Sequence, residues 1–178
     1  MLIVGDPFPD FNLTAVTGAD HTKDFHPVTL KTYGSKWKVF FFWPKDFTFV
    51  CPTEIVGFGK LHKEFKDADA ELIGASTDSD FVHAAWREHH PQLKGSAFPW
   101  LADIKKELST ALGILHEGAG VANRATFIVD ADNKIRYVEM TDLSVGRNPK
   151  ETLRILNALQ KGELMPCAWE PGEATLSK

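Results

Sequence analysis

The sequence predicts an α/β fold in which helices cover the faces of a mixed central sheet. Two observations lead to this prediction. Short apolar runs of strand length recur along the chain, and segments with apolar residues at helical spacing lie between them. Their order, β-α-β-α-(β)-α-β-β-α, is typical of a mixed sheet flanked by helices.

The first half of this pattern begins with residues 38–43, a continuous apolar run rich in aromatics that suits a strand buried on both faces. Pro44 ends this strand. Residues 53–67 place apolar side chains at helical spacing with charged residues outside them, which predicts one helix. Residues 71–76 are a second apolar run, and residues 80–90 predict a helix closed by a proline.

The second half repeats the alternation. Residues 105–112 predict a short helix that a glycine ends. The apolar runs 125–130 and 134–140 flank Ala-Asp-Asn at 131–133, which predicts a hairpin. The segment 148–161 opens with Asn and Pro, with Glu three positions after the Asn, and this order is typical of the start of an amphipathic helix.

The chain has the length and composition of one domain, with 178 residues, 43% of them hydrophobic and 25% charged. No linker or internal repeat divides it. We therefore expect a single domain over residues 1–178, with an irregular C-terminal arm over residues 162–178.

Charge and cysteine content narrow the class of protein. A formal charge of −4 without a basic cluster gives no reason to expect a nucleic-acid or membrane partner. The first twenty residues lack the features of a signal peptide, and the apolar run 39–43 is too short to cross a bilayer. We expect a cytoplasmic protein, in which Cys51 and Cys167 serve redox or catalytic chemistry.

Cys51 is the candidate reactive residue, because it lies where a predicted strand has ended and a predicted helix begins. Pro52 suits the first helical position, which places Cys51 at the N-cap or in the first turn. There, free backbone N–H groups and the helix dipole favour the thiolate, which is the nucleophilic form of cysteine.

Nearby residues suit the reduction of a peroxide. Pro44 can shield the sulfur from water, and the Thr48 hydroxyl can hydrogen-bond a substrate oxygen. Glu54 can orient an arginine that also faces the thiolate. Arg124 and Arg147 are the candidates for that arginine, and spacing alone places neither.

The motif over residues 44–54, P-x-x-x-T-x-x-C-P-T-E, resembles the signature of the peroxiredoxins. Within that family it is most similar to the typical two-cysteine enzymes of the alkyl hydroperoxide reductase C type. The resemblance covers nearly the whole chain, as far as Cys167. It implies a thioredoxin-like fold and a thiol-dependent peroxidase that reduces hydrogen peroxide and organic hydroperoxides in antioxidant defence.

The resemblance also implies roles for individual residues. Trp86 matches a position at which the family often has an aromatic residue near the active site. The implied catalytic residues are the peroxidatic Cys51, the pocket residues Pro44, Thr48 and Arg124, and the resolving Cys167, supported by Glu54 and by Arg147, which Glu54 is expected to bridge.

The reaction that the resemblance implies needs partners. The sulfenic acid of Cys51 condenses with Cys167 of a second subunit, and a thioredoxin, a flavoprotein disulfide reductase or a CxxC-bearing protein reduces the disulfide. A homodimer is expected to assemble into a decameric or dodecameric ring, with no cofactor and no metal. The tail lacks a Tyr-Phe ending and residues 94–99 lack the GGLG motif, so we expect an unpinned tail and resistance to sulfinic acid formation.

Other interpretations remain open. A metal site would use His83 with the His-His pair at 89–90, which we instead expect to be surface histidines. A protease-type Cys–His pair would join Cys51 to a histidine elsewhere in the chain. A redox sensor or chaperone would use Cys51 without turnover, and a disulfide reductase is disfavoured because Cys51 belongs to no CxxC motif. The candidate partners for a Cys–His pair are His26, His62 and His116.

Overall fold

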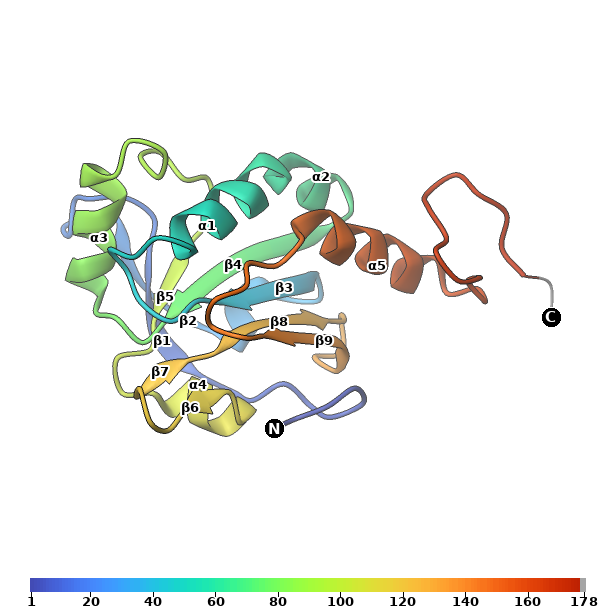
Figure 1. The fold of residues 1–178 in the computed structure, drawn as a ribbon, viewed down its shortest axis with the longest axis horizontal. Coiled ribbons are helices and arrows are strands. Elements are labelled where there is room, and N and C mark those ends of the chain that lie inside the picture. The colour runs from blue at the N-terminus through green and yellow to red at the C-terminus, as the bar shows by residue number, and fades with distance from the viewer. Residues whose placement is uncertain (177–178) are drawn as a thin grey trace.

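The computed structural model describes residues 1–176 of the chain. Its strands and helices alternate much as the sequence predicts (Figure 1). The strands are β1 (Asn12–Val16), β2 (Phe25–Thr29), β3 (Trp37–Phe42), β4 (Ala70–Ser76), β5 (Trp100–Ala102), β6 (Leu115–His116), β7 (Val121–Ala122), β8 (Arg124–Val129) and β9 (Ile135–Thr141). The helices are η1 (Leu30–Tyr33, a 3-10 helix), α1 (Cys51–Lys60), α2 (His62–Asp67), α3 (Asp80–His89), α4 (Glu107–Leu112) and α5 (Pro149–Lys161).

Seven of these strands form one sheet in the order β2-β1-β5-β4-β3-β8-β9. β3 pairs parallel with β4, and β4 pairs parallel with β5. The other pairs in this sheet are antiparallel. The predicted α/β fold with a mixed central sheet is therefore confirmed.

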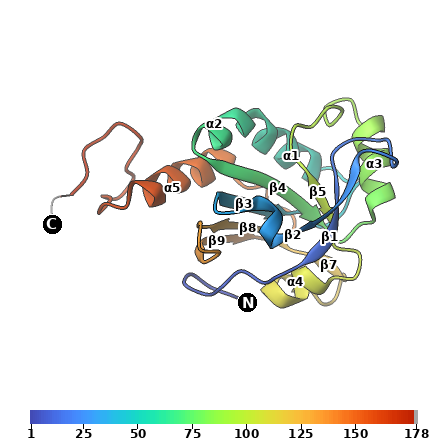
Figure 2. The same cartoon turned by 180° about the vertical axis from the view of Figure 1, so that it is seen from behind.

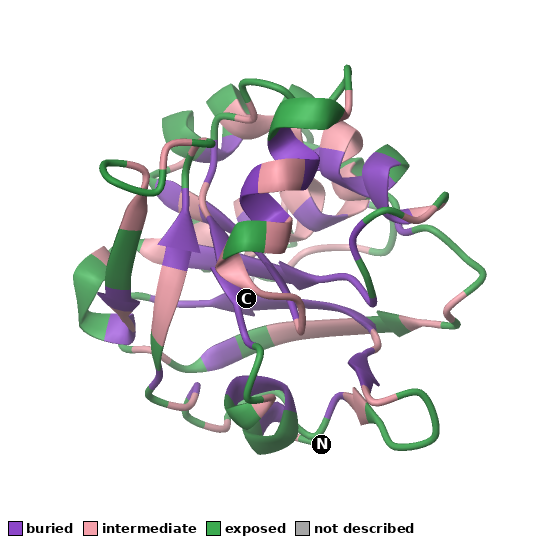
Figure 3. Cartoon of the chain, turned by 90° about the vertical axis from the view of Figure 1, so that its left-hand side faces the viewer, coloured by how far each residue is buried: buried purple, intermediate pink, exposed green. Residues whose placement is uncertain are grey.

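Two hydrophobic cores lie on the two faces of the sheet. Figures 1 and 2 show the helices that cover these faces. Successive side chains of a strand point to opposite faces. On β3, Val39 and Phe41 therefore join the core under α1, α2, α3 and α5, whereas Phe40 and Phe42 join the core under α4 and the N-terminal segment. Figure 3 shows the buried residues concentrated along the strands, inside an exposed outer surface. Cys51 belongs to the first of these cores, called here the helix-covered core.

The segment 53–67, predicted as one helix, is two helices. α1 begins earlier, at Cys51, and α2 follows Leu61, whose φ of −102° and ψ of 8° leave the α-helical path. Two glycines lie in α1, and glycine weakens a helix interior. One of them has a packing role: a Cβ at Gly57 would lie 3.2 Å from Cγ of Pro149, so its absence lets the start of α5 approach α1.

The sequence does not predict β1 and β2. Each has only five residues and mixes polar with apolar side chains. β2 also contains Pro27, which an edge strand tolerates because one side of its ladder is free. Pairing with each other and with β5 makes these segments strands, and such long-range pairing leaves little local signal.

Helix α3 buries polar side chains. His83 and Arg87 are buried along with Trp86, while Phe81 is 62% exposed. Arg87 donates hydrogen bonds to three main-chain carbonyl oxygens, at distances of 2.6 to 3.1 Å. The expectation that His83 is a surface histidine is therefore wrong.

The C-terminal arm follows α5 and extends from the body of the molecule (Figure 1). Trp169 is 2% exposed, and Nη1 of Arg154 donates to its carbonyl oxygen at 2.7 Å. Nζ of Lys161 lies 5.6 Å from the centre of the Trp169 ring. The expectation of an unpinned tail is therefore wrong at Trp169, which holds the arm to α5. The last two residues of the predicted arm, 177–178, lie outside the described residues. No helix within residues 1–176 is both long enough and apolar enough to span a membrane.

Candidate active site

Cys51 is the first residue of α1, after Val50 as N-cap. Cys51 therefore lies in the first turn, which is one of the two positions that the sequence allowed. The sequence predicted Pro52 at the first helical position, but Pro52 occupies the second. The Cys51 side chain packs into the helix-covered core and is 1% exposed. Its Sγ accepts a hydrogen bond from Nη1 of Arg124 at 3.3 Å.

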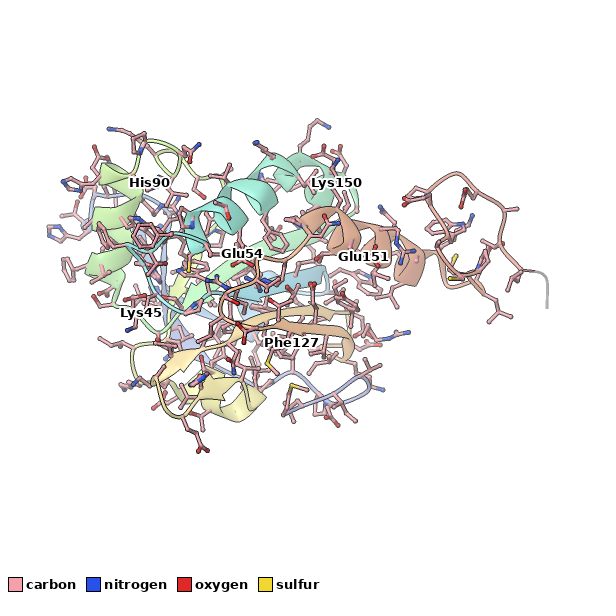
Figure 4. All side chains as sticks on the ribbon, viewed as in Figure 1. Lys45, Glu54, His90, Phe127, Lys150 and Glu151 are labelled. Atoms are coloured by element: carbon pink, nitrogen blue, oxygen red, sulfur yellow. The ribbon has the colours of Figure 1, made fainter. Side chains whose placement is uncertain are left out.

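Glu54, one turn further along α1, binds both candidate arginines. Its Oε2 accepts from Nη1 of Arg124 at 2.7 Å, and its Oε1 accepts from Nε of Arg147 at 2.8 Å and from the Arg147 backbone N–H at 3.0 Å. Figure 4 shows Glu54 on α1, above the strands of the sheet. The structure therefore brings together four of the predicted site residues, including two arginines that spacing alone did not place.

The surrounding backbone fixes both guanidinium groups. Nε of Arg124 donates to the carbonyl oxygen of Leu143 at 2.8 Å. Nη1 of Arg147 donates to the carbonyl oxygen of Ala125 at 2.6 Å, and its guanidinium carbon lies 5.8 Å from the centre of the Phe41 ring. With both side chains at most 4% exposed, neither arginine has room to reorient.

These contacts set the charge of the site. Burial alone would raise the pKa of the Glu54 carboxyl, but the hydrogen bonds and charge of Arg147 and the charge of Arg124 hold that pKa below its usual value. Burial raises the pKa of Glu139, a further carboxyl near Arg147 on β9, and so favours its neutral form. The three charges in direct contact sum to one positive charge, which a thiolate at Cys51 would balance.

Pro44 and Thr48 lie in the segment that joins β3 to α1. Pro44 is buried, and Thr48 is partly buried with its hydroxyl donating to the carbonyl oxygen of Lys45 at 2.9 Å. The structure records no hydrogen bond from Thr48 to Cys51 within residues 1–176. Trp86 reaches the same segment, because its ring centre lies 5.8 Å from that of Phe47.

Sequence reasoning missed Asp46, which lies in this segment. Its Oδ2 faces Nδ1 of His83 at 2.6 Å, and its Oδ1 accepts from Nε1 of Trp43 at 2.7 Å. Both side chains of the Asp46–His83 pair are 0% exposed. The available signal was the position of Asp46, three residues before the Phe-Val-Cys run of the motif. Its partner, His83, is 37 residues away in the sequence.

The other histidine interpretations find no support in the described part of the chain. His26, His62 and His116 make no hydrogen bond to Cys51 there. No group of three or more His, Cys, Asp or Glu side chains within residues 1–176 is arranged to hold a metal ion.

Cys167 lies apart from this site. It is exposed in the arm beyond α5, whereas Cys51 is buried at the start of α1, and both cysteines are free. Within a single chain the structure does not bring the two sulfurs together.

A mixed sheet under helices, with a buried cysteine opening one helix beside an arginine, defines a thiol enzyme of the thioredoxin fold. The model of the AhpC/TSA family matches residues 4–138. The chain belongs to the AhpC/TSA family.

Similar proteins cover almost the whole chain. Alkyl hydroperoxide reductase C of Mycolicibacterium smegmatis is 50% identical over 185 residues, which span 99% of this chain and 94% of the relative. The solved structure of Mycobacterium tuberculosis AhpC matches with a TM-score of 0.87 at 50% identity, over 96% of this chain and 99% of that one. The reduced 2-Cys peroxiredoxin of Plasmodium vivax matches with a TM-score of 0.91 at 31% identity, over 98% and 92% of the two chains.

Proposed function

We propose that the protein is a thiol-dependent peroxidase that reduces hydrogen peroxide and organic hydroperoxides, with Cys51 as the attacking thiol. One observation carries the proposal: Nη1 of Arg124 donates to Cys51 Sγ at 3.3 Å inside a buried group of charges that carries one excess positive charge. This arrangement favours a thiolate, which attacks an O–O bond directly. The names of the similar proteins, alkyl hydroperoxide reductase and peroxiredoxin, support the same activity.

In the first step, the Cys51 thiolate attacks the outer oxygen of R–O–O–H. An S–O bond forms while the O–O bond breaks, and the leaving RO⁻ takes up a proton to become an alcohol, or water when the substrate is hydrogen peroxide. Cys51 is left as a sulfenic acid. Arg124 stabilises the negative charge that moves from sulfur to the leaving oxygen, Pro44 limits access of water, and the Thr48 hydroxyl orients the peroxide.

In the second step, the thiol of Cys167 condenses with this sulfenic acid to give a disulfide and water. We assign that Cys167 to a second subunit, because the arm carries it away from the buried Cys51 of its own chain. The protein then works as a homodimer, which we propose assembles into a ring. Each chain is a single domain with its C-terminal arm from residue 162 onward.

In the third step, a dithiol protein reduces the disulfide, itself becoming oxidised, and restores both thiols. A thioredoxin, a flavoprotein disulfide reductase and a CxxC-bearing protein are the candidates. A chain with two cysteines has no disulfide framework of the kind that exported domains use, so we assign the protein to the cytoplasm.

Peroxide consumption measured with each candidate reductant and several peroxides tests this function. The wild type should turn over, Cys167→Ser should consume a single equivalent of peroxide, and Cys51→Ser should consume none. Oxidised wild type should run as a dimer on a non-reducing gel. Turnover by Cys51→Ser would disprove the assignment, and consumption limited to one equivalent by wild type with every reductant would favour a sensor.

A further inference from the structure

Residues 44–50, called here the entry loop, join β3 to Cys51 and contain Pro44 and Thr48. The loop presents two aromatic side chains to solvent, Phe47 at 58% and Phe49 at 92% exposure. Between its ends it is anchored through one buried residue, Asp46. The backbone N–H of Asp46 donates to Oδ2 of Asp78 at 2.8 Å, so both the main chain and the side chain of Asp46 are fixed.

His83, the partner of Asp46, forms hydrogen bonds through both ring nitrogens. Nε2 of His83 lies 3.2 Å from the carbonyl oxygen of Leu101, and Nδ1 lies 2.6 Å from Oδ2 of Asp46. A carbonyl oxygen only accepts hydrogen bonds, so Nε2 carries a proton, and a second proton lies between Nδ1 and Oδ2 of Asp46. The geometry therefore describes a buried His83 that binds both Asp46 and the carbonyl oxygen of Leu101, with its ring centre 5.6 Å from those of Trp43 and Trp100.

The chemistry proposed for Cys51 uses neither member of this pair. A buried hydrogen-bonded pair adds only modest net stability, because folding exchanges hydrogen bonds to water for bonds within the protein. Such a pair does select one arrangement of the segments it joins, since breaking it leaves a buried polar group without a partner. Here the pair joins α3 to the entry loop, which leads directly into the reactive Cys51.

We propose that Asp46 and His83 are positioning residues of the peroxidase: their buried hydrogen-bonded pair fixes the entry loop, and through it Pro44, Thr48 and the first turn of α1, in the arrangement that presents Cys51 to peroxide. This inference rests on the proposed function.

The same pair opposes the later step. Cys51 is 1% exposed, so a second thiol reaches its sulfur only after the entry loop or the first turn of α1 has moved. Fixing the loop favours the attack on peroxide and slows the formation of the disulfide. Weakening the pair is therefore expected to slow the attack on peroxide and to speed the formation of the disulfide. A general loss of stability would not have to change the two rates in opposite directions.

Asp46→Asn and His83→Asn each replace one partner of this short hydrogen bond while keeping a polar side chain. The oxidation of Cys51 by hydrogen peroxide is measured in a Cys167→Ser background, and disulfide formation is measured after one peroxide addition to chains with both cysteines. We expect the first rate to fall about tenfold or more, as when a catalytic group is slightly misplaced, and the second rate to rise about threefold.

The matched control is Asp130→Asn. Asp130 is 7% exposed and pairs with Arg136 at 3.1 Å, at the hairpin end of β8 opposite Arg124. It should change neither rate more than about twofold, since it does not contact the entry loop. Asp78→Asn weakens the backbone anchor of Asp46 and the Ser76 hydrogen bond to the same oxygen, but keeps the Asp46–His83 contact. It should give smaller changes in the same two directions, so it provides a test if the stronger variants do not fold.

Rates that both stay at wild-type values, or that both fall, in Asp46→Asn, His83→Asn or the folded Asp78→Asn would overturn the inference. A wild-type Cys51 that peroxide does not oxidise would instead overturn the proposed function. The two failures are therefore distinguishable.

Discussion

Arg124→Ala tests the central contact of the site. The substitution removes the guanidinium whose Nη1 lies 3.3 Å from Cys51 Sγ, with the two residues 4% and 1% exposed. At an effective dielectric constant of about 20, two unit charges at this distance attract by about 5 kcal/mol. Glu54 binds the same nitrogen at 2.7 Å and cancels part of this attraction.

If about half of that attraction acts on the reacting sulfur, Arg124→Ala loses about 2.5 kcal/mol of electrostatic stabilisation. This loss corresponds to a rate of Cys51 oxidation about 70-fold lower. Stopped-flow oxidation of Cys51 by hydrogen peroxide, in a Cys167→Ser background, measures this rate. Alkylation by iodoacetamide measures thiolate reactivity separately and should slow as well. Arg124→Lys keeps the charge but cannot donate to Cys51, Glu54 and Leu143 together, so its rate should lie between those of wild type and alanine.

The control is Arg136→Ala, which removes an equal charge from a partly exposed ion pair with Asp130 on the hairpin. It should leave the peroxide rate unchanged. An Arg124→Ala rate within about threefold of wild type would refute the electrostatic argument, since it would leave less than about 0.7 kcal/mol for the contact.

Two further predictions concern stability and the arm. Burial raises the pKa of Glu54, but the two arginines outweigh burial and hold this pKa below its ordinary value of about 4.3. The stability that Glu54 contributes is therefore present above the ordinary pKa and is lost as pH falls through the lower pKa of the folded state. Urea midpoints of wild type should therefore fall more steeply below pH 4 to 5 than those of Glu54→Gln, and parallel curves would contradict this. Trp169→Ala removes the buried ring that holds the arm to α5, so limited proteolysis should cut residues 162–176 faster while Cys51 oxidation by peroxide stays unchanged. Equal cleavage of the two proteins would show that Trp169 does not hold the arm.

Local signals explain which elements the sequence predicts well. The aromatic run of β3 requires burial on both faces, and the Asn148-Pro149 start of α5 matches its structure, with the Asn148 side chain accepting from the backbone N–H of Lys150. The hairpin turn contains Asn133 at a φ of 62°, a conformation that asparagine tolerates. In each case the residues that determine the conformation lie within a few positions of one another.

Long-range contacts explain what the sequence leaves out. Glu54 meets Arg124 and Arg147 across 70 and 93 residues, and only the family resemblance indicated these partners. Asp46 and His83 are 37 residues apart in the sequence. Without knowledge of this partner, the mixed apolar and polar neighbours of His83 predict a surface residue. The strands β1 and β2 depend in the same way on each other and on β5.

Cys51 is a packed member of the helix-covered core as well as the proposed nucleophile. Each oxygen atom added to its sulfur enlarges a side chain that aromatic and aliphatic groups already enclose, and overpacking a core costs about 1–3 kcal/mol. The oxidation state of one atom is thereby coupled to the folding free energy of the domain. On the proposed mechanism, oxidation by peroxide is expected to loosen the protein at the place that has to open before a second thiol reaches the sulfur.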